Sequence, residues 1–243
     1  MPPDPAEAAR LRLFQLVSPA LPVGAFSYSE GVEVLVQQGR VGDAAALRGW
    51  LEAELRCGAL TLEVAALAPL RQGLERWRDR DGADARVAAA DLIDLDGWLL
   101  ALREAPELRA QQRQMGRSLL QLLADLGWPP PALHGVSAGA GPGHALAWPA
   151  AFAWACLCFE LDSPAMQEAY LYGWAANQIS AAVRLVPLGP TEGQRLQLQL
   201  APLIAGRAAV LAVADPRRLW SGGVGAGLAQ LRHAELYSRL FRS

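Results

Sequence analysis

The chain has 243 residues and a net charge of −2, and its 22 basic residues are all arginine. Acidic and basic residues are interspersed, so we expect neither a broad basic face for nucleic acid nor a polybasic tract for a membrane. A P-loop NTPase, a Schiff-base enzyme and a lysine general base are excluded, because each needs the ammonium group of a lysine.

Leu, Ala and Arg dominate the composition and β-branched runs are almost absent, which favours helix throughout. We expect an all-α fold, a single-domain helical bundle of about eight to ten helices over residues 1–214, followed by a C-terminal tail over residues 215–243. The longest apolar run, residues 146–159, is too short to cross a bilayer. With no export signal and only three cysteines, a cytoplasmic protein is expected.

Helical periodicity predicts the elements in chain order, at residues 6–17, 27–38, 43–74, 85–103, 107–126, 145–160, 163–186 and 191–214. Asp43 is expected to cap the third helix, which Gly58 or Pro69 divides. Residues 76–84 and 128–143 are expected to be exposed connections.

Several helix ends carry specific signals. Pro106 is expected in the first turn of the fifth helix, and Ser163 with Pro164 at the start of the seventh. Thr191 and Gln194 match a capping box that opens the eighth helix, which Pro202 breaks or kinks. In the tail, residues 221–227 form a glycine-rich linker before a basic amphipathic end at 228–243.

A polar and aromatic segment at residues 18–33 separates the first two helical patterns. Pro22 and Gly24 predict a turn there, and Ser27 with Glu30 matches a second capping box. The segment is therefore expected to be a helix–loop–helix corner that leaves its two aromatic rings, Phe26 and Tyr28, only partly buried. Spacing alone leaves two interpretations open, a packed structural corner and a contact surface.

The sequence offers no metal-binding motif. Its histidines, His134, His144 and His233, are far apart, although a site shared across a dimer stays open for His134 or His233. Cys156 and Cys158 point to opposite sides of a helix, so they are expected to be buried hydrophobic residues.

No catalytic residue and no cofactor site is predicted either. Ser27 and Ser29 do not match a nucleophile motif, and the glycine-rich loops do not match a phosphate-binding loop. Asp94 and Asp96 are two residues apart on a predicted helix, where a solvated face is expected rather than acid–base chemistry.

A polar stripe on the seventh predicted helix consists of Asn177, Ser180 and Arg184, at helical spacings of three and four residues. Polar side chains on a mostly apolar helix need partners. Two alternatives stay open for Arg184, an internal pair with Glu33 or Glu107 and a contact with another protein.

The corner sequence Leu-Pro-Val-Gly-Ala-Phe-Ser-Tyr-Ser-Glu-Gly-Val-Glu at residues 21–33 resembles the N-terminal signature of the urease accessory protein UreF family. Residues 107–117, 181–194 and 232–243 agree with further family stretches in the same order, so the resemblance spans nearly the whole chain. Two positions depart from it: Ala25 replaces a common second glycine, and Pro190 replaces a common glutamine.

The resemblance implies an all-helical, homodimeric, cytoplasmic protein without catalytic activity, cofactor or metal site of its own. It implies as partners the accessory protein UreD (also called UreH), the GTPase UreG and apo-urease, into which the assembly inserts nickel. The tail then becomes ordered when the second accessory protein binds. The residues expected to contact partners are Pro22, Gly24, Phe26, Tyr28, Glu33, Arg184, Gln194, His233, Tyr237, Arg239 and Phe241.

Two other functions stay open. One is direct regulation of the partner GTPase, with Arg184 supplying charge to the transferring phosphate as arginine fingers do. The other is a small metal-binding chaperone, which the three scattered histidines disfavour.

Overall fold

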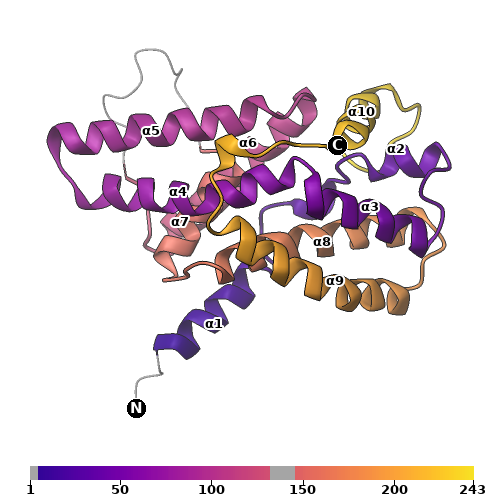
Figure 1. Cartoon of the computed structure of the whole chain (residues 1–243), viewed down its shortest axis with the longest axis horizontal. Coiled ribbons are helices and arrows are strands. Elements are labelled where there is room, and N and C mark those ends of the chain that lie inside the picture. The colour runs from indigo at the N-terminus through magenta and orange to yellow at the C-terminus, as the bar shows by residue number, and fades with distance from the viewer. Residues whose placement is uncertain (1–4, 132–145) are drawn as a thin grey trace.

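The computed structural model describes residues 5–131 and 146–243. Over these residues the chain forms ten α-helices and three 3-10 helices and contains no strand (Figure 1), so the expected all-α fold is confirmed. The α-helices are α1 (Pro5–Leu16), α2 (Val32–Gln37), α3 (Ala44–Cys57), α4 (Leu60–Asp79), α5 (Gly82–Ala101), α6 (Pro106–Asp125), α7 (Trp148–Cys158), α8 (Ala165–Leu185), α9 (Pro190–Leu211) and α10 (Val224–Arg232). The 3-10 helices are η1 (Ala25–Ser27), η2 (Pro216–Arg218) and η3 (His233–Glu235).

Helix α4 is the centre of the bundle. It packs most extensively against α5 and α7 and also touches α3, α8 and α9. Its first eight residues, 60–67, are all buried, which fits a helix enclosed on every side. Helix α7 is buried from residue 149 to 157 for the same reason, whereas α1 projects from the body (Figure 1).

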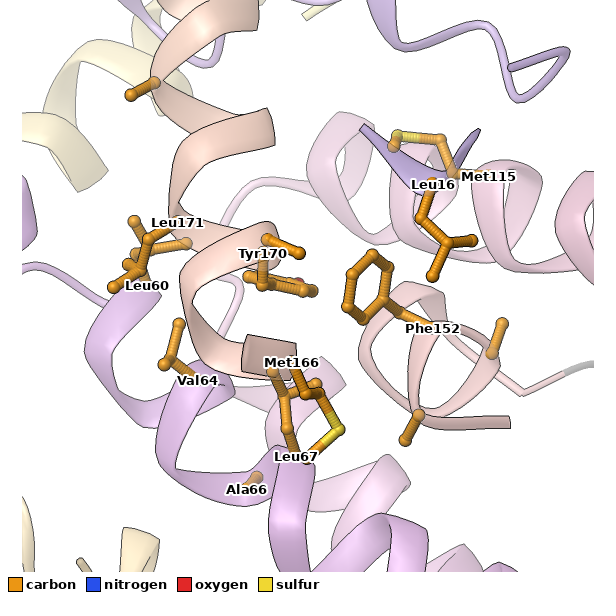
Figure 2. Close-up of a cluster of buried hydrophobic side chains, with 14 of the residues drawn as sticks. Leu16, Leu60, Val64, Ala66, Leu67, Met115, Phe152, Met166, Tyr170 and Leu171 are labelled. Atoms are coloured by element: carbon orange, nitrogen blue, oxygen red, sulfur yellow. The ribbon is translucent and has the colours of Figure 1, made fainter. Parts of the chain in front are cut away.

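Part of the core forms where α4, α7 and α8 meet (Figure 2). The ring of Tyr170 on α8 packs edge to face on Phe152 of α7, with ring centroids 5.1 Å apart. Leu16 at the end of α1 and Met115 of α6 lie on the other side of Phe152. This cluster places the hydroxyl of Tyr170 deep inside the bundle, where it needs a hydrogen-bond partner.

Most helix boundaries agree with the periodicity. The carboxylate of Asp43 caps α3 by accepting from Ala46 N at 2.8 Å, and Gly58 separates α3 from α4. Pro106 lies in the first turn of α6 as expected. Pro69 and Pro202 lie inside α4 and α9 without ending them.

Two connections differ from the prediction. The exposed connection expected at residues 76–84 is shorter, because α4 continues to Asp79 and α5 begins at Gly82. Residues 128–131 are not helical, and the rest of the predicted loop at 132–143 lies outside the described residues, as do His134 and His144. None of the described helices is long and apolar enough to span a bilayer.

Both predicted capping boxes are wrong. At the corner, Ser27 ends η1 and Glu30 has a φ of 49°, so α2 starts only at Val32 after Gly31. Two features favour glycine at position 31, just before α2. Its φ of 93° lies in the left-handed region, and a Cβ atom would lie 3.1 Å from the Cβ of Ala229 on α10.

The second box fails because proline suits the first helical position. The fixed φ of Pro190 and its missing N–H favour that place, so α9 begins at Pro190 and Thr191 lies already inside the helix. At α8 the helix begins at Ala165 after Pro164, and Ser163 makes no side-chain cap.

The tail, residues 215–243, runs back over the bundle and ends at the corner. The expected glycine-rich linker at 221–227 is partly helical, because α10 begins at Val224. The last residues pair with the corner backbone: Ser29 N donates to Ser243 O at 2.6 Å, and Arg242 N donates to Ser27 O at 2.8 Å. The C-terminus therefore lies beside α2 and α10 (Figure 1).

Candidate functional site

The carboxylate of Glu33 on α2 holds the end of the tail. It is buried, and it accepts from Leu240 N at 2.6 Å and from Phe241 N at 3.1 Å. Nε2 of His233 lies 3.2 Å from the same carboxylate. One side chain of the corner thus joins two separate parts of the tail.

His233 is fully buried within the chain, so its ring does not face outward as a site shared across a dimer requires. Its Nδ1 lies 2.9 Å from Oε2 of Glu107, while its Nε2 faces Glu33. Each ring nitrogen of His233 therefore faces a carboxylate oxygen, one from α2 and one from α6. Arg239 also forms an ion pair with Glu107, at 2.8 Å, so two side chains of the tail contact this carboxylate.

The polar stripe of α8 faces the corner backbone. Arg184 donates to Phe26 O at 3.2 Å, and its guanidinium lies 4.6 Å from the ring centre of Phe241. Asn177 donates to Tyr28 O at 3.2 Å. The suggested internal pair of Arg184 with Glu33 or Glu107 is therefore wrong, because those carboxylates bind the tail.

The structure separates the predicted contact residues into two groups. Tyr28, Glu33, His233 and Phe241 are buried within the chain, so the expectation that Tyr28 is only partly buried is wrong. Exposed residues are Pro22, Phe26, Arg184, Gln194, Tyr237 and Arg239, and Gly24 is half-buried. Phe26 is 69% exposed, so it is the ring of the corner that faces solvent.

A buried polar cluster beneath the corner was not predicted. Glu63 on α4 accepts from Arg103 Nε at 2.9 Å, from Gln112 at 3.2 Å and from the hydroxyl of Tyr170 at 2.8 Å. Glu63 and Arg103 are both almost fully buried. The pair supplies the partner that the Tyr170 hydroxyl requires.

The surroundings of the cluster raise the pKa of two of its carboxyl groups. Burial raises the pKa of Glu63 despite Arg103, and the charge of Glu30 raises it further. Burial also raises the pKa of Glu54, from its ordinary value of 4.5 to about 7, with Arg103 opposing and Glu30 adding to the shift. Of the three carboxyl groups, Glu63 is the one that pairs directly with the guanidinium of Arg103.

Replacing Glu54 by Gln tests the raised pKa of this buried carboxyl group. Because the folded pKa of Glu54 is raised, its favourable contribution is complete below about pH 4.5 and is lost as the pH rises through about 7. Glu54→Gln should therefore raise the free energy of unfolding by about 2–3 kcal/mol at about pH 8 and leave it nearly unchanged at about pH 4.5. Urea denaturation at the two pH values measures this.

The matched control is Glu52→Gln on the same helix. Hydrogen bonding from Arg48 lowers the pKa of Glu52. Glu52→Gln should therefore lower the free energy of unfolding slightly, whereas Glu54→Gln raises it. A Glu54→Gln variant that is equally stabilised at both pH values, or not at all, would contradict the assignment.

A pocket of about 290 Å³ opens between the corner, α6, α7 and α8. Exposed residues at its mouth are Pro19, Phe26, Tyr172 and Ser180. Its inner walls include Leu16, Phe152 and Tyr170, whose side chains point toward one another in Figure 2. Met115, Glu30, Glu63, Gln111 and Gln112 also line it. The pocket thus connects the exposed corner with the buried polar cluster.

The other candidates from the sequence are structural. Asp96 is buried rather than solvated, because its carboxylate accepts from Ala147 N at 3.1 and 3.2 Å, and burial raises its pKa to about 6. Asp94 is exposed and pairs with Arg217. Cys156 is buried, as expected, and burial raises the pKa of the half-buried Cys158 to about 11.

Within the described residues, no group of three His, Cys, Asp or Glu side chains is arranged to hold a metal ion. His233 meets two carboxylates, but Arg239 and the tail amides share them.

The sequence contained one indication of the buried polar cluster around Glu63, which we did not predict. Glu63 interrupts the run Leu-Thr-Leu-Glu-Val-Ala-Ala-Leu, and a charge in a buried helix needs a partner. Its partners could not be read from spacing, since Arg103 and Tyr170 are 40 and 107 residues away.

Comparison with known proteins agrees with these observations. The model of the UreF family matches residues 41–201. The urease accessory protein UreF of Thermosynechococcus vestitus is 39% identical over 98% of this chain and 99% of its own length. That of Microcystis aeruginosa is 41% identical over 96% of this chain and 97% of its own. The urease accessory protein UreF of Alkalilimnicola ehrlichii is 37% identical over 97% of this chain and 96% of its own length. The chain therefore belongs to the UreF family of urease accessory proteins.

Proposed function

We propose that this chain is a cytoplasmic assembly factor of urease maturation that performs no reaction itself. It bridges the accessory protein UreD (UreH) and the GTPase UreG to apo-urease, so that nickel can be inserted. The observation that carries this proposal is the exposed apolar surface of the tail, residues 215–243. Its exposed large apolar side chains are Trp220, Val224, Leu228, Leu231, Tyr237 and Leu240.

Such a surface is typical of a protein contact site, where aromatic anchors contribute most of the affinity. Trp220 is 92% and Tyr237 106% exposed, so neither ring has a packing role within the chain. The tail is then the segment that binds the second accessory protein.

A homodimer is part of the same proposal. Helix α1 projects from the bundle and exposes Leu11 and Phe14. A second copy that covers these two side chains would remove them from water.

The test is the double variant Trp220→Asp/Tyr237→Asp. Because both side chains are exposed, the fold should stay intact while affinity for UreD falls roughly 100-fold, as expected for the loss of two aromatic anchors. Size-exclusion chromatography of the mixed proteins measures the complex.

The matched control is Val87→Asp/Leu198→Asp, which changes two exposed apolar residues on α5 and α9 and should leave the complex intact. A complex that survives the tail variant contradicts the proposed role of the tail. GTP hydrolysis by UreG, measured with and without this chain, separates assembly from direct regulation, since assembly alone does not raise the rate. Arg184 is engaged with Phe26 and Phe241, which argues against its use as an arginine finger.

A further inference from the structure

The pocket beneath the corner has an uncompensated negative charge. Among the described residues that line it, two are carboxylates, Glu30 and Glu63, and none is basic. The charge of Glu63 is balanced by Arg103 behind it. Glu30 is bound only by neutral donors, Gln111 Nε2 at 2.7 Å and Trp174 Nε1 at 3.0 Å.

One acceptor in the pocket is unused. Gln112 is 5% exposed and lines the pocket, and its amide nitrogen donates to Glu63. Within the described residues, its buried Oε1 has no hydrogen-bond partner. A buried acceptor without a donor is destabilising, so the site suits a ligand that supplies N–H groups.

Glu30 is held in an unusual backbone conformation. Its φ of 49° lies in the left-handed region, which a residue with a long side chain rarely adopts. Such strain is maintained only when the surroundings fix it, and it gathers at ligand sites. Here it places the carboxylate between Gln111 and Trp174, at the pocket wall.

Six aromatic side chains contribute to the walls of the pocket. They are Phe26, Trp148, Phe152, Tyr170, Tyr172 and Trp174. Aromatic faces attract cations, and they also pack against hydrocarbon. The volume of about 290 Å³ is at the small end of the range that small-molecule sites occupy, roughly 300–1,000 Å³.

We propose that this pocket binds an organic cation, an ammonium or guanidinium group on a short apolar stem. The head donates to Glu30 and to Oε1 of Gln112, and the stem lies between the aromatic walls. An anion is disfavoured by the two carboxylates, and a neutral apolar molecule leaves the acceptors unpaired. The cation arrives either as a free small molecule or as a lysine or arginine side chain of a bound protein.

The test is calorimetric titration of the full chain with n-butylguanidinium at low ionic strength. The wild-type chain should bind it, and N-butylurea, which has the same shape without the charge, should bind at least about tenfold more weakly. Glu30→Gln should weaken n-butylguanidinium binding by about tenfold or more, because a charge-assisted hydrogen bond is lost. Glu235→Gln, which removes an exposed carboxylate on η3, should have no effect.

Two further variants keep the test decisive if Glu30→Gln does not fold. Gln112→Met removes the unused acceptor, together with the hydrogen bond to Glu63, at nearly the same side-chain size. Tyr172→Leu removes an exposed ring at the mouth. Each should weaken binding several-fold. The proposal is overturned if n-butylguanidinium does not bind, if the neutral analogue binds equally well, or if these variants leave binding unchanged.

Titration of the complex with UreD then identifies the source of the cation. If the complex no longer takes up n-butylguanidinium, a protein side chain occupies the pocket, whereas continued uptake indicates a free ligand. Either result supports the pocket assignment.

Discussion

Arg103→Met is expected to lower the free energy of unfolding by about 3–5 kcal/mol, because it leaves the carboxylate of Glu63 buried without its counter-charge. Both side chains are almost fully buried, and the guanidinium donates to Glu63 through Nε at 2.9 Å. The loss should grow as the pH rises, since a protonated Glu63 needs no cation. Urea denaturation at about pH 5 and about pH 8 measures both effects.

A double-mutant cycle separates the ion pair from simple loss of packing. Adding Glu63→Gln to Arg103→Met should recover more than half of the lost stability, because a neutral amide no longer requires the guanidinium. Arg86→Met, on the exposed side of α5, should change stability little. If the double variant is no more stable than Arg103→Met, the cost is one of packing and the charge assignment is wrong.

The helices could largely be predicted, because their signals are local. Buried apolar positions recur with helical period, and Asp43, Gly58 and Pro106 mark boundaries through their own backbone chemistry. The capping boxes were wrong where two local signals competed. Pro190 was the stronger signal at α9, and at the corner Gly31 lies in the left-handed region and carries no Cβ to clash with α10.

The candidate site could be predicted only in part. The corner and tail were recognised as unusual, and Phe26 and Tyr237 are exposed as a contact surface requires. The sequence could not show that Glu33 binds the tail, because that contact joins residues about two hundred positions apart. The same holds for Glu63 and its partners, because their contact depends on how α4, α6, α8 and the connection between α5 and α6 pack together.

The attachment of the tail gives the second large effect. Glu33→Ala removes the acceptor of Leu240 N, Phe241 N and His233, and charge-assisted hydrogen bonds contribute about 1.5–3 kcal/mol each. The end of the tail should therefore open more easily by at least about 3 kcal/mol, which is roughly a 100-fold faster hydrogen exchange at the amides of Leu240 and Phe241.

The bundle should respond differently from the tail. Amides of α4 and α7 depend on packing that Glu33 does not share, so their exchange should change far less. The control is Gln37→Ala, which removes a neutral, exposed hydrogen bond to Ser238 O of the same tail and should change exchange by less than about tenfold. Unchanged exchange at Leu240 and Phe241 in Glu33→Ala would show that other contacts hold the tail. If exchange increases in the tail but not in α4 and α7, the buried carboxylate of Glu33 controls how readily the tail opens. The tail carries the exposed side chains Tyr237 and Leu240, so this opening would affect its binding to a partner.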